Sequence, residues 1–328
     1  MAPDKTRRHW LVLRDALRRS TSGSEQLRAT ASSIAAEFFP VFAASAPDAT
    51  QLQLQPALED FAWVAYDLSP ATHAQPTRVF VHEKRKDVKR VSIAELLSHQ
   101  VNQGVDNTGN IRTWPSEQIL LSYLLQSGVC SRVQRRDVGG ELLPIACCEL
   151  GSGMAGLASL GLLARPPVAL QRVVVTDGNP QSVKNLQLCV EENRKQRVFP
   201  AHGQDPAVTA ELLRWDRDVA LREDLQHQFD LVFASDCLFF EEFHEDLAHT
   251  IKRLLRPGSG RCLLLQPSRN GSMERFSAVA TRLGLHVLES RAYDPEIQRQ
   301  HAAYERDRAD YVPDVHLPVL LTVSHTPN

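Results

Sequence analysis

A glycine-rich segment in the middle of the chain is the strongest candidate for chemistry. Residues 149–156 spell Glu-Leu-Gly-Ser-Gly-Met-Ala-Gly, in which Gly151 and Gly153 begin a G-x-G-x-x-G pattern. The pattern follows an apolar, strand-like run and precedes a helix-like run, the context in which such a loop binds a nucleotide cofactor. The glycines would let the backbone approach that cofactor closely. The sequence pattern of this loop alone fits both a nicotinamide dinucleotide and S-adenosyl-L-methionine.

Three groups of neighbouring residues bear on the choice between these cofactors. Glu149 precedes the first glycine, where a carboxylate would repel a pyrophosphate but attract the cationic sulfonium and ammonium of S-adenosylmethionine. Asp177 ends the next predicted strand, where it would accept hydrogen bonds from the ribose hydroxyls of either cofactor. Trp215 and Asp216 follow a further run, where they would stack on adenine and accept from its exocyclic amine. Together they favour S-adenosylmethionine.

Each signal also has an alternative that stays open at this stage. The loop could be a tight turn between a strand and a helix without any ligand. Trp215 could be a core tryptophan next to a surface acid. A nicotinamide-dependent oxidoreductase would share both the glycines and the ribose acid. Against that enzyme class stand Glu149 and the lack of an evident hydride-transfer constellation in the sequence.

An alternation of strands and helices must position these residues. Pro115 opens a predicted helix that runs to about Gln126 and stops at Gly128. Apolar runs predict strands at 143–150, 172–176, 229–235, 260–266, 285–290 and 316–323, with helical spacing at 180–193, 243–255 and 273–283. The alternation predicts an α/β fold with a mostly parallel sheet and helices on both faces.

The composition excludes several classes of partner. Lys and Arg number 37 against 39 Asp and Glu, so the net charge of −2 gives no bulk attraction to nucleic acid. The longest near-apolar stretch, 156–164, is too short to span a bilayer. Six cysteines lack the C-x-x-C spacing of a zinc site. Cys147, Cys148 and Cys262 lie in apolar runs and predict buried free thiols in a reducing compartment. We therefore expect no nucleic acid, membrane or metal partner.

The first part of the chain is less regular than the rest. Residues 1–110 predict a smaller, irregular α+β region that could dock a substrate, and residues 111–328 predict the catalytic domain. Strands are expected at 61–66 and 78–82, and the charged run 82–90 predicts a solvated hairpin tip or a patch for an acidic partner. Residues 106–110 have the chemistry of a turn. The basic segment 7–19 predicts a cap helix, with a helix-in-groove ligand and an organelle presequence as alternatives.

Several motifs together resemble the class I, seven-β-strand protein-lysine methyltransferases. They are Glu149–Met154, Thr176–Asn179, Arg214–Asp216 and Phe229–Phe239. More narrowly, the segment 106–117 (Asp-Asn-Thr-Gly-Asn-Ile-Arg-Thr-Trp-Pro-Ser-Glu) resembles the calmodulin-lysine N-methyltransferase family, as do residues 235–239, 251–257 and 293–294. The similarity covers about residues 100–328 and is much weaker over the first hundred. The glycine loop is generic to class I enzymes, whereas segments 106–117 and 236–239 are specific.

The resemblance implies a Rossmann-like, seven-stranded fold and assigns a role to individual residues. Gly151 and Gly153 would line the methionine part of the cofactor. Asp177 with the nearby Asn179 would bind its ribose side, and Trp215 would pack on adenine. Trp114 would close over the cofactor, and Ser235 would line the pocket. Asp236 and Phe239 fall on a D-x-x-(Tyr/Phe) motif that shapes the lysine channel. Phenylalanine carries no hydroxyl, so a hydroxyl-based proton relay is not available there.

The implied reaction transfers methyl groups to the ε-amine of a protein lysine, in calmodulin. The amine must be neutral, and with a pKa of about 10.4 only about one free lysine in a thousand is neutral at pH 7. Asp236 would orient the lysine and pass its proton toward water, or it would only accept backbone N–H groups. Phe239 would hold a methylated ammonium by cation–π contact, which favours multiple methylation.

The predicted enzyme is a monomer of the cytoplasm, and also of the nucleus. The alternative to calmodulin is an enzyme of the same kind that methylates a lysine of another protein. A third possibility keeps the fold without catalysis, as a cofactor-binding interaction module.

Overall fold

The computed structural model describes residues 38–58, 60–69, 77–85, 113, 115–200, 206–239 and 241–326 of the chain. Their strands form one sheet of seven strands and one of three. The order of the larger sheet is β6-β5-β4-β7-β8-β10-β9. In that order, its strands span Ala207–Leu212, Leu170–Asp177, Ile145–Glu149, Leu231–Ser235, Arg261–Gln266, Val319–Ser324 and His286–Ser290.

The larger sheet is parallel except at one edge. Strands β6, β5, β4, β7 and β8 pair in parallel, whereas β10 runs antiparallel to both β8 and β9. All five residues of β4 are buried, as expected for a central strand that is covered on both faces. The prediction of a Rossmann-like, mostly parallel sheet of seven strands is confirmed.

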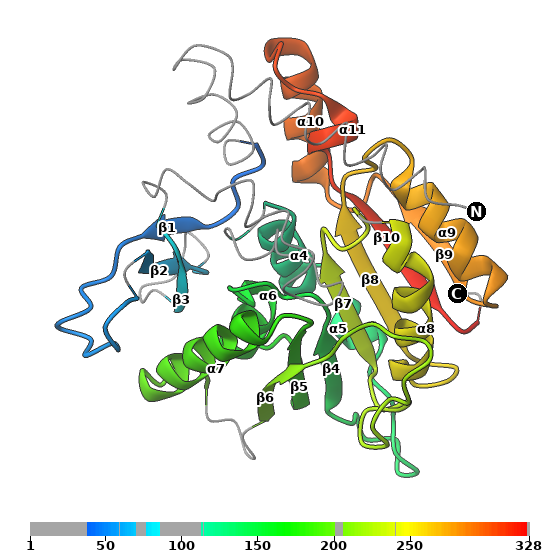
Figure 1. Ribbon diagram of the computed structural model, residues 1–328, viewed down its shortest axis with the longest axis horizontal. Helices are drawn as coiled ribbons and strands as arrows, with labels where there is room; N and C mark the ends of the chain where they lie inside the picture. Colours follow the sequence, from blue (N-terminus) through cyan, green and yellow to red (C-terminus); the bar gives the residue numbers. More distant parts are fainter. Residues whose placement is uncertain are drawn as a thin grey trace.

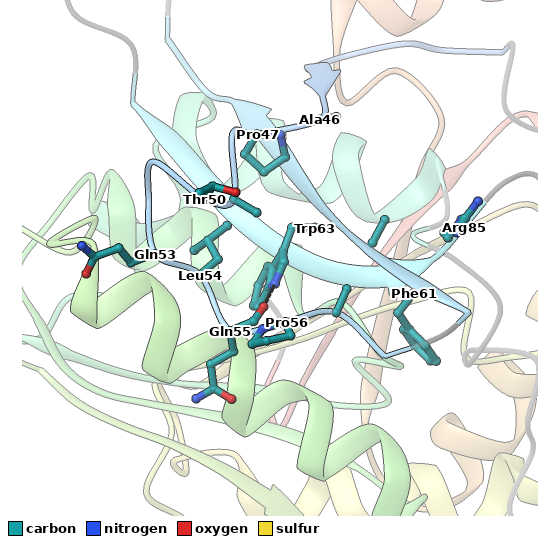
Figure 2. A pocket seen from close by; sticks show the side chains of 13 residues that line it. Ala46, Pro47, Thr50, Gln53, Leu54, Gln55, Pro56, Phe61, Trp63 and Arg85 are labelled. Atoms are coloured by element: carbon teal, nitrogen blue, oxygen red, sulfur yellow. Dashed lines mark hydrogen bonds between the residues drawn. The ribbon is translucent and has the colours of Figure 1, made fainter.

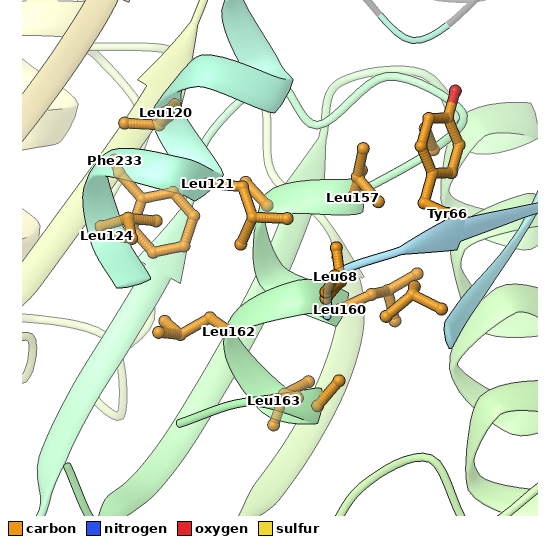
Figure 3. Packing of buried hydrophobic residues seen from close by; sticks show 14 of the residues in the cluster. Tyr66, Leu68, Leu120, Leu121, Leu124, Leu157, Leu160, Leu162, Leu163 and Phe233 are labelled. Atoms are coloured by element: carbon orange, nitrogen blue, oxygen red, sulfur yellow. The ribbon is translucent and has the colours of Figure 1, made fainter. Parts of the chain in front are cut away.

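Helices cover both faces of this sheet (Figure 1). The helices of the described residues are α4 (Pro115–Gln126), α5 (Val129–Arg132), α6 (Leu157–Ala164), α7 (Pro180–Lys195), α8 (His244–Leu254), α9 (Ser272–Arg282), α10 (Pro295–Asp307) and α11 (Pro313–His316), with a short 3-10 turn η2 (Glu241–Phe243) before α8. Neighbouring residues of a strand point to opposite faces, so Cys147 packs with α4, α6 and α7, whereas Cys148 packs with α8 and α9. Figure 3 shows Leu121 and Leu124 of α4 gathered with Leu162 of α6 and Phe233 of β7.

The smaller sheet packs against helix α7 through its edge strand. Its antiparallel strands are β1 (Ala43–Ser45), β2 (Phe61–Asp67) and β3 (Arg78–Lys84). The Phe80 N–H donates to Asn193 Oδ1 at 2.9 Å, and the Phe80 carbonyl accepts from Asn193 Nδ2 at 2.6 Å. The His82 carbonyl accepts from Asn185 Nδ2 at 2.6 Å. Two asparagines on one face of α7 thus bind the backbone of β3 where a fourth strand would otherwise pair.

The structure corrects the prediction of a solvated hairpin tip at residues 82–90. Strand β3 continues to Lys84, and His82 and Glu83 are only 0% and 4% exposed. Both polar side chains are buried because each has partners inside the protein, Asn185 for His82 and Thr113 for Glu83. Residues 86–90 lie outside the described part, as do the predicted helix 7–19 and the turn 106–110.

Two further differences lie near the end of the chain. The last strand begins at Val319 rather than at His316, which lies in α11. Helix α10 was not predicted, because Ile297 is its one buried residue and it carries no apolar stripe. Its start nevertheless has a clear local cause, since the Asp294 side chain accepts from the Glu296 N–H at 2.8 Å and Pro295 opens the first turn. Across the described residues, no helix combines the length and apolar character that crossing a bilayer requires.

Candidate functional site

The predicted site residues gather at one edge of the large sheet. Glu149, Asp177 and Ser235 end the neighbouring strands β4, β5 and β7, and Trp215 follows β6. The chain passes from β4 to β5 on one side and later returns to β7 on the other, so this edge contains the point where the strand order reverses. Ligands of α/β sheets bind in the crevice at such a point. Trp114 lies outside the described residues, so its role stays a prediction.

The glycine loop has a backbone conformation that favours glycine. Gly151 and Gly153 both have φ of +61°, a conformation that side chains with a Cβ rarely adopt. A Cβ built on Gly151 would come within 2.8 Å of Cys237 Sγ and 3.2 Å of Trp215 Cζ2. The loop, the indole ring and the start of the segment after β7 are therefore in direct contact, and only a glycine fits at this position; we call these three groups the glycine cradle. Glycines with left-handed backbones at this edge of the sheet fit the predicted cofactor site.

Asp177 is bound to the same loop. Its Oδ2 accepts the Gly153 N–H at 2.9 Å, and its Oδ1 accepts the Asn179 N–H at 2.7 Å. These two bonds hold the carboxylate at the carboxyl end of β5, beside the glycine loop, and its predicted contact with the ribose stays a prediction. The Asn179 side chain itself accepts from the Gln181 N–H at 2.8 Å and caps α7. This cap accounts for the asparagine without a ligand, and its predicted contact with the cofactor stays a prediction.

Trp215 and Asp216 have different surroundings. Trp215 is half-buried against the glycine loop, with one edge of its ring toward Gly151. Asp216 is exposed, and its Oδ1 accepts the N–H groups of Asp218 at 2.8 Å and Val219 at 3.2 Å. The tryptophan is placed to contact a ligand in the cradle, whereas the aspartate stabilises the following turn.

Glu149 belongs to a buried pair of carboxyl groups at the start of α6. Its Oε2 accepts the Ser159 N–H at 3.0 Å, and Glu117 Oε1 accepts the N–H groups of Leu157 and Ala158. Burial raises the pKa of Glu149 to about 7. Burial first, and the nearby Glu149 second, raise the pKa of Glu117 well above its usual range. The helix N-terminus favours the charged forms, but two carboxylates this close cannot both ionise cheaply at neutral pH.

A third buried acid connects the small sheet to this pair. Glu83 Oε2 accepts from Thr113 Oγ1 at 2.6 Å, just before Trp114 and Pro115 in the sequence. The Tyr66 hydroxyl donates to the same carboxylate at 3.4 Å. Burial, with Glu83 second, raises the pKa of Tyr66 above its ordinary value. The small sheet thereby binds Thr113, which lies two residues before the start of α4.

The predicted lysine-channel residues have an unexpected partner. Asp236 has a left-handed backbone, with φ of +52°, and its Oδ1 lies 2.6 Å from Arg269 Nη2. Phe239 is 39% exposed, and the Arg269 guanidinium carbon lies 5.6 Å from the centre of its ring. Asp236 and Phe239 therefore share one cation of this chain, from the loop after β8.

Sequence reasoning missed four residues of this region: Glu83, Glu117, Asn185 and Arg269. Asn185 Nδ2 also donates to the Met154 carbonyl of the glycine loop at 2.7 Å. The repeat of Asn, Cys and Asn at 185, 189 and 193 on an otherwise amphipathic helix is a signal that could have revealed this contact. Glu117 lies in the polar first turn of α4, where an acid is ordinary, so the sequence gives no signal that it is buried. Arg269 follows its strand without any local pattern.

An open hollow of about 550 Å³ lies elsewhere, on the small sheet (Figure 2). Its lining is mainly apolar and includes Leu54, Pro56, Phe61 and Trp63, with Arg85 at one end. None of the predicted site residues that the structure describes lines it. The hollow is therefore separate from the glycine cradle.

Comparison with known proteins identifies the family. A family model described as lysine methyltransferase matches residues 96–282, more than half of the chain. The calmodulin-lysine N-methyltransferase of Arabidopsis thaliana is 32% identical over 294 residues, which cover 89% of this chain and 86% of that protein.

Solved structures with a similar course of the chain are more distant. A methyltransferase from Pyrococcus furiosus is 15% identical, covers 72% of this chain and 93% of its own, and has a TM-score of 0.40. The ribosomal protein L11 methylase from Lactobacillus delbrueckii subsp. bulgaricus is 15% identical, covers 68% and 83%, and has a TM-score of 0.39. At these TM-scores neither adds to the assignment, which rests on the family model and the plant relative. The chain belongs to the S-adenosylmethionine-dependent protein-lysine methyltransferase family.

Proposed function

We propose that this enzyme methylates a lysine of calmodulin. The observation that carries the proposal is the plant relative, a calmodulin-lysine N-methyltransferase whose 294 matched residues extend well beyond the generic family region 96–282. The sequence segments 106–117 and 236–239, which are specific among the motifs of this chain, support it. A lysine of a different protein is the second candidate, because the glycine loop and the sheet would serve either substrate equally.

The cofactor supplies an electrophilic methyl group with its leaving group attached, so the protein mainly binds, aligns and excludes water. Gly151 and Gly153 would hold the cofactor by allowing close backbone approach, and Trp215, which packs directly beside Gly151, would contact it next to the loop. Asp177, which its backbone hydrogen bonds hold beside the glycine loop, would accept hydrogen bonds from the ribose hydroxyls. Glu149 would supply negative charge beneath the loop.

Asp236 and Phe239 would receive the lysine on the β7 side of the same edge. The ring of Phe239 is 39% exposed and its centre lies 5.6 Å from the Arg269 guanidinium carbon; beside that cation it would hold a methylated ammonium by cation–π contact, which survives each added methyl group. Asp236 would orient the amine and accept its proton on the way to water. This arrangement favours the addition of more than one methyl group to a single lysine.

The substrate is tested by competition. Purified enzyme and cofactor with a radiolabelled methyl group are added to a calmodulin-depleted protein extract, to the same extract with calmodulin restored, and to purified calmodulin. We expect strong label in calmodulin in the last two reactions. A calmodulin in which every lysine is replaced by arginine serves as the matched control and should stay unlabelled. Label in other proteins of the depleted extract, with none in calmodulin, would assign the enzyme to a different lysine substrate.

A further inference from the structure

Arg269 occupies the position between two groups that the proposed function assigns to the substrate. Its Nη2 lies 2.6 Å from Asp236 Oδ1, and its guanidinium carbon lies 5.6 Å from the centre of the Phe239 ring. The Asp236 side chain is 11% exposed and that of Arg269 is 25% exposed. An ion pair this well shielded from water is much stronger than one on the open surface.

The backbone around Arg269 is fixed rather than loose. Arg269 and Asn270 both have a left-handed conformation, with φ of +50° and +57°. The Arg269 N–H donates to the Asp314 carbonyl at 2.9 Å, and the Asn270 N–H donates to Asp314 Oδ2 at 2.7 Å. Helix α11 thus holds the loop, so the guanidinium approaches Asp236 from a tethered backbone. Non-glycine residues in this conformation cost conformational energy and gather at functional sites.

Other ionisable groups near this pair are engaged elsewhere. On α9 and η2, Arg275 pairs with Glu241 at 2.7 Å, and Glu274 accepts from Ser268 Oγ at 3.2 Å. On α11, burial lowers the pKa of His316, and the charge of Arg269 lowers it further. Asp314 binds the backbone of the loop. Among the described residues, Arg269 is the cation that forms an ion pair with Asp236.

We propose that Arg269 neutralises Asp236 and thereby keeps the lysine channel from stabilising a protonated amine. The inference rests on the proposed function and adds to it. An unpaired carboxylate within about 4–6 Å of the substrate amine would favour the ammonium form and oppose methyl transfer. With the guanidinium in place, Asp236 keeps its acceptor oxygens for orienting the amine, and the ion pair, with no net charge, lets the proton pass on to water instead of holding it on the amine. Arg269 is thus an electrostatic positioning residue, not a group that reacts.

The pH dependence of kcat/KM with calmodulin tests the inference. In R269Q the unpaired Asp236 should shift the midpoint of the acidic limb to higher pH by about one unit. As a result, kcat/KM should fall about tenfold at pH 7 and approach the wild-type value at high pH. R269K keeps the positive charge and should keep the wild-type profile. D236N/R269Q removes both charges and should return the midpoint of the acidic limb toward the wild-type value, whatever its maximal rate.

Thermal melting and S-adenosylmethionine affinity, measured on every variant, separate charge effects from misfolding. A uniform loss of activity at all pH values in R269Q, with an unshifted midpoint, would show a structural role and overturn the inference. Higher activity of R269Q at pH 7 would also overturn it, because it would mean that the guanidinium competes with the substrate lysine. If wild-type enzyme labels no calmodulin, the proposed function fails first, and the role of Arg269 fails with it.

Discussion

Glu149 is a buried carboxyl group that changes its charge near neutral pH. Because burial raises its pKa to about 7, it is mostly protonated at pH 6 and mostly ionised at pH 8. If its charge attracts the cationic cofactor, the affinity for S-adenosylmethionine rises across this interval. The amino group of the cofactor titrates in a similar range, so the informative quantity is the difference between wild type and a neutral variant.

Glu149→Gln should lack the part of this rise in cofactor affinity that comes from the ionisation of Glu149. We expect its affinity for S-adenosylmethionine to be about tenfold weaker than wild type at pH 8 and close to wild type at pH 6. Calorimetric titration in buffers of different ionisation enthalpy also reports protons released on binding, which should be fewer in the variant. Glu192→Gln is the matched control, since Glu192 is also buried but pairs with Lys195 at 3.5 Å along α7. Equal affinities of wild type and E149Q at pH 8 would exclude an electrostatic role of Glu149.

Gly151 tests the cradle itself. In Gly151→Ala the new methyl group would meet Cys237 Sγ at 2.8 Å and Trp215 at 3.2 Å, so it either displaces these groups or occupies the space of the cofactor. We expect S-adenosylmethionine affinity to fall by at least about a hundredfold, measured by calorimetry, which corresponds to roughly 3 kcal/mol. Gly258→Ala introduces the same left-handed strain, at φ of +79°, with no atom within 4 Å. That control should lower stability and leave cofactor affinity unchanged; a similar loss in both variants would count against the cradle.

At the scale of elements, helix α7 joins the small sheet to the glycine loop. Asn185 and Asn193 both bind the backbone of β3, but only Asn185 also donates to the Met154 carbonyl, at 2.7 Å. Both side chains are buried, so truncating either leaves unpaired backbone groups inside the protein. The two asparagines therefore form a natural pair for separating docking of the sheet from support of the loop.

Asn185→Ala and Asn193→Ala should both lower the melting temperature by several degrees, because each loses buried hydrogen bonds worth about 1–3 kcal/mol. We expect weaker S-adenosylmethionine binding, by about tenfold, in Asn185→Ala only. Thermal unfolding and calorimetric titration measure the two effects on the same samples. An equal loss of affinity in both variants would mean that the small sheet as a whole, and not the Met154 contact, supports the loop.

At the scale of the whole molecule, the sequence predicts those features of the fold and the site that depend on residues close together in the chain. Strand ends carry Glu149 and Asp177, and the alternation of apolar runs predicts both the sheet and the edge where these acids meet. The glycine-rich pattern likewise predicts a loop between a strand and a helix, which the structure has between β4 and α6. These features depend on near neighbours in the chain, so the sequence pattern is enough to locate them.

The rest depends on contacts between distant segments. Glu83 looks like part of a solvated charge run, and only its contact with Thr113, far along the chain, makes it a buried residue. Arg269 carries no local signal, because its role depends on its ion pair with Asp236, which directly follows the neighbouring strand β7. Which side chains neutralise a site is decided by tertiary packing, and this is where reading the sequence alone falls short.

The central claim is that this chain moves a methyl group from S-adenosylmethionine to the ε-nitrogen of a protein lysine. The most direct test incubates wild-type enzyme and calmodulin with cofactor whose methyl group carries deuterium, followed by tandem mass spectrometry of calmodulin peptides. The account predicts deuterated methyl groups on the side chain of one lysine, increasing in number with time, and their absence with Gly151→Ala. Cofactor consumption without a labelled lysine, or label confined to another residue type, would contradict it.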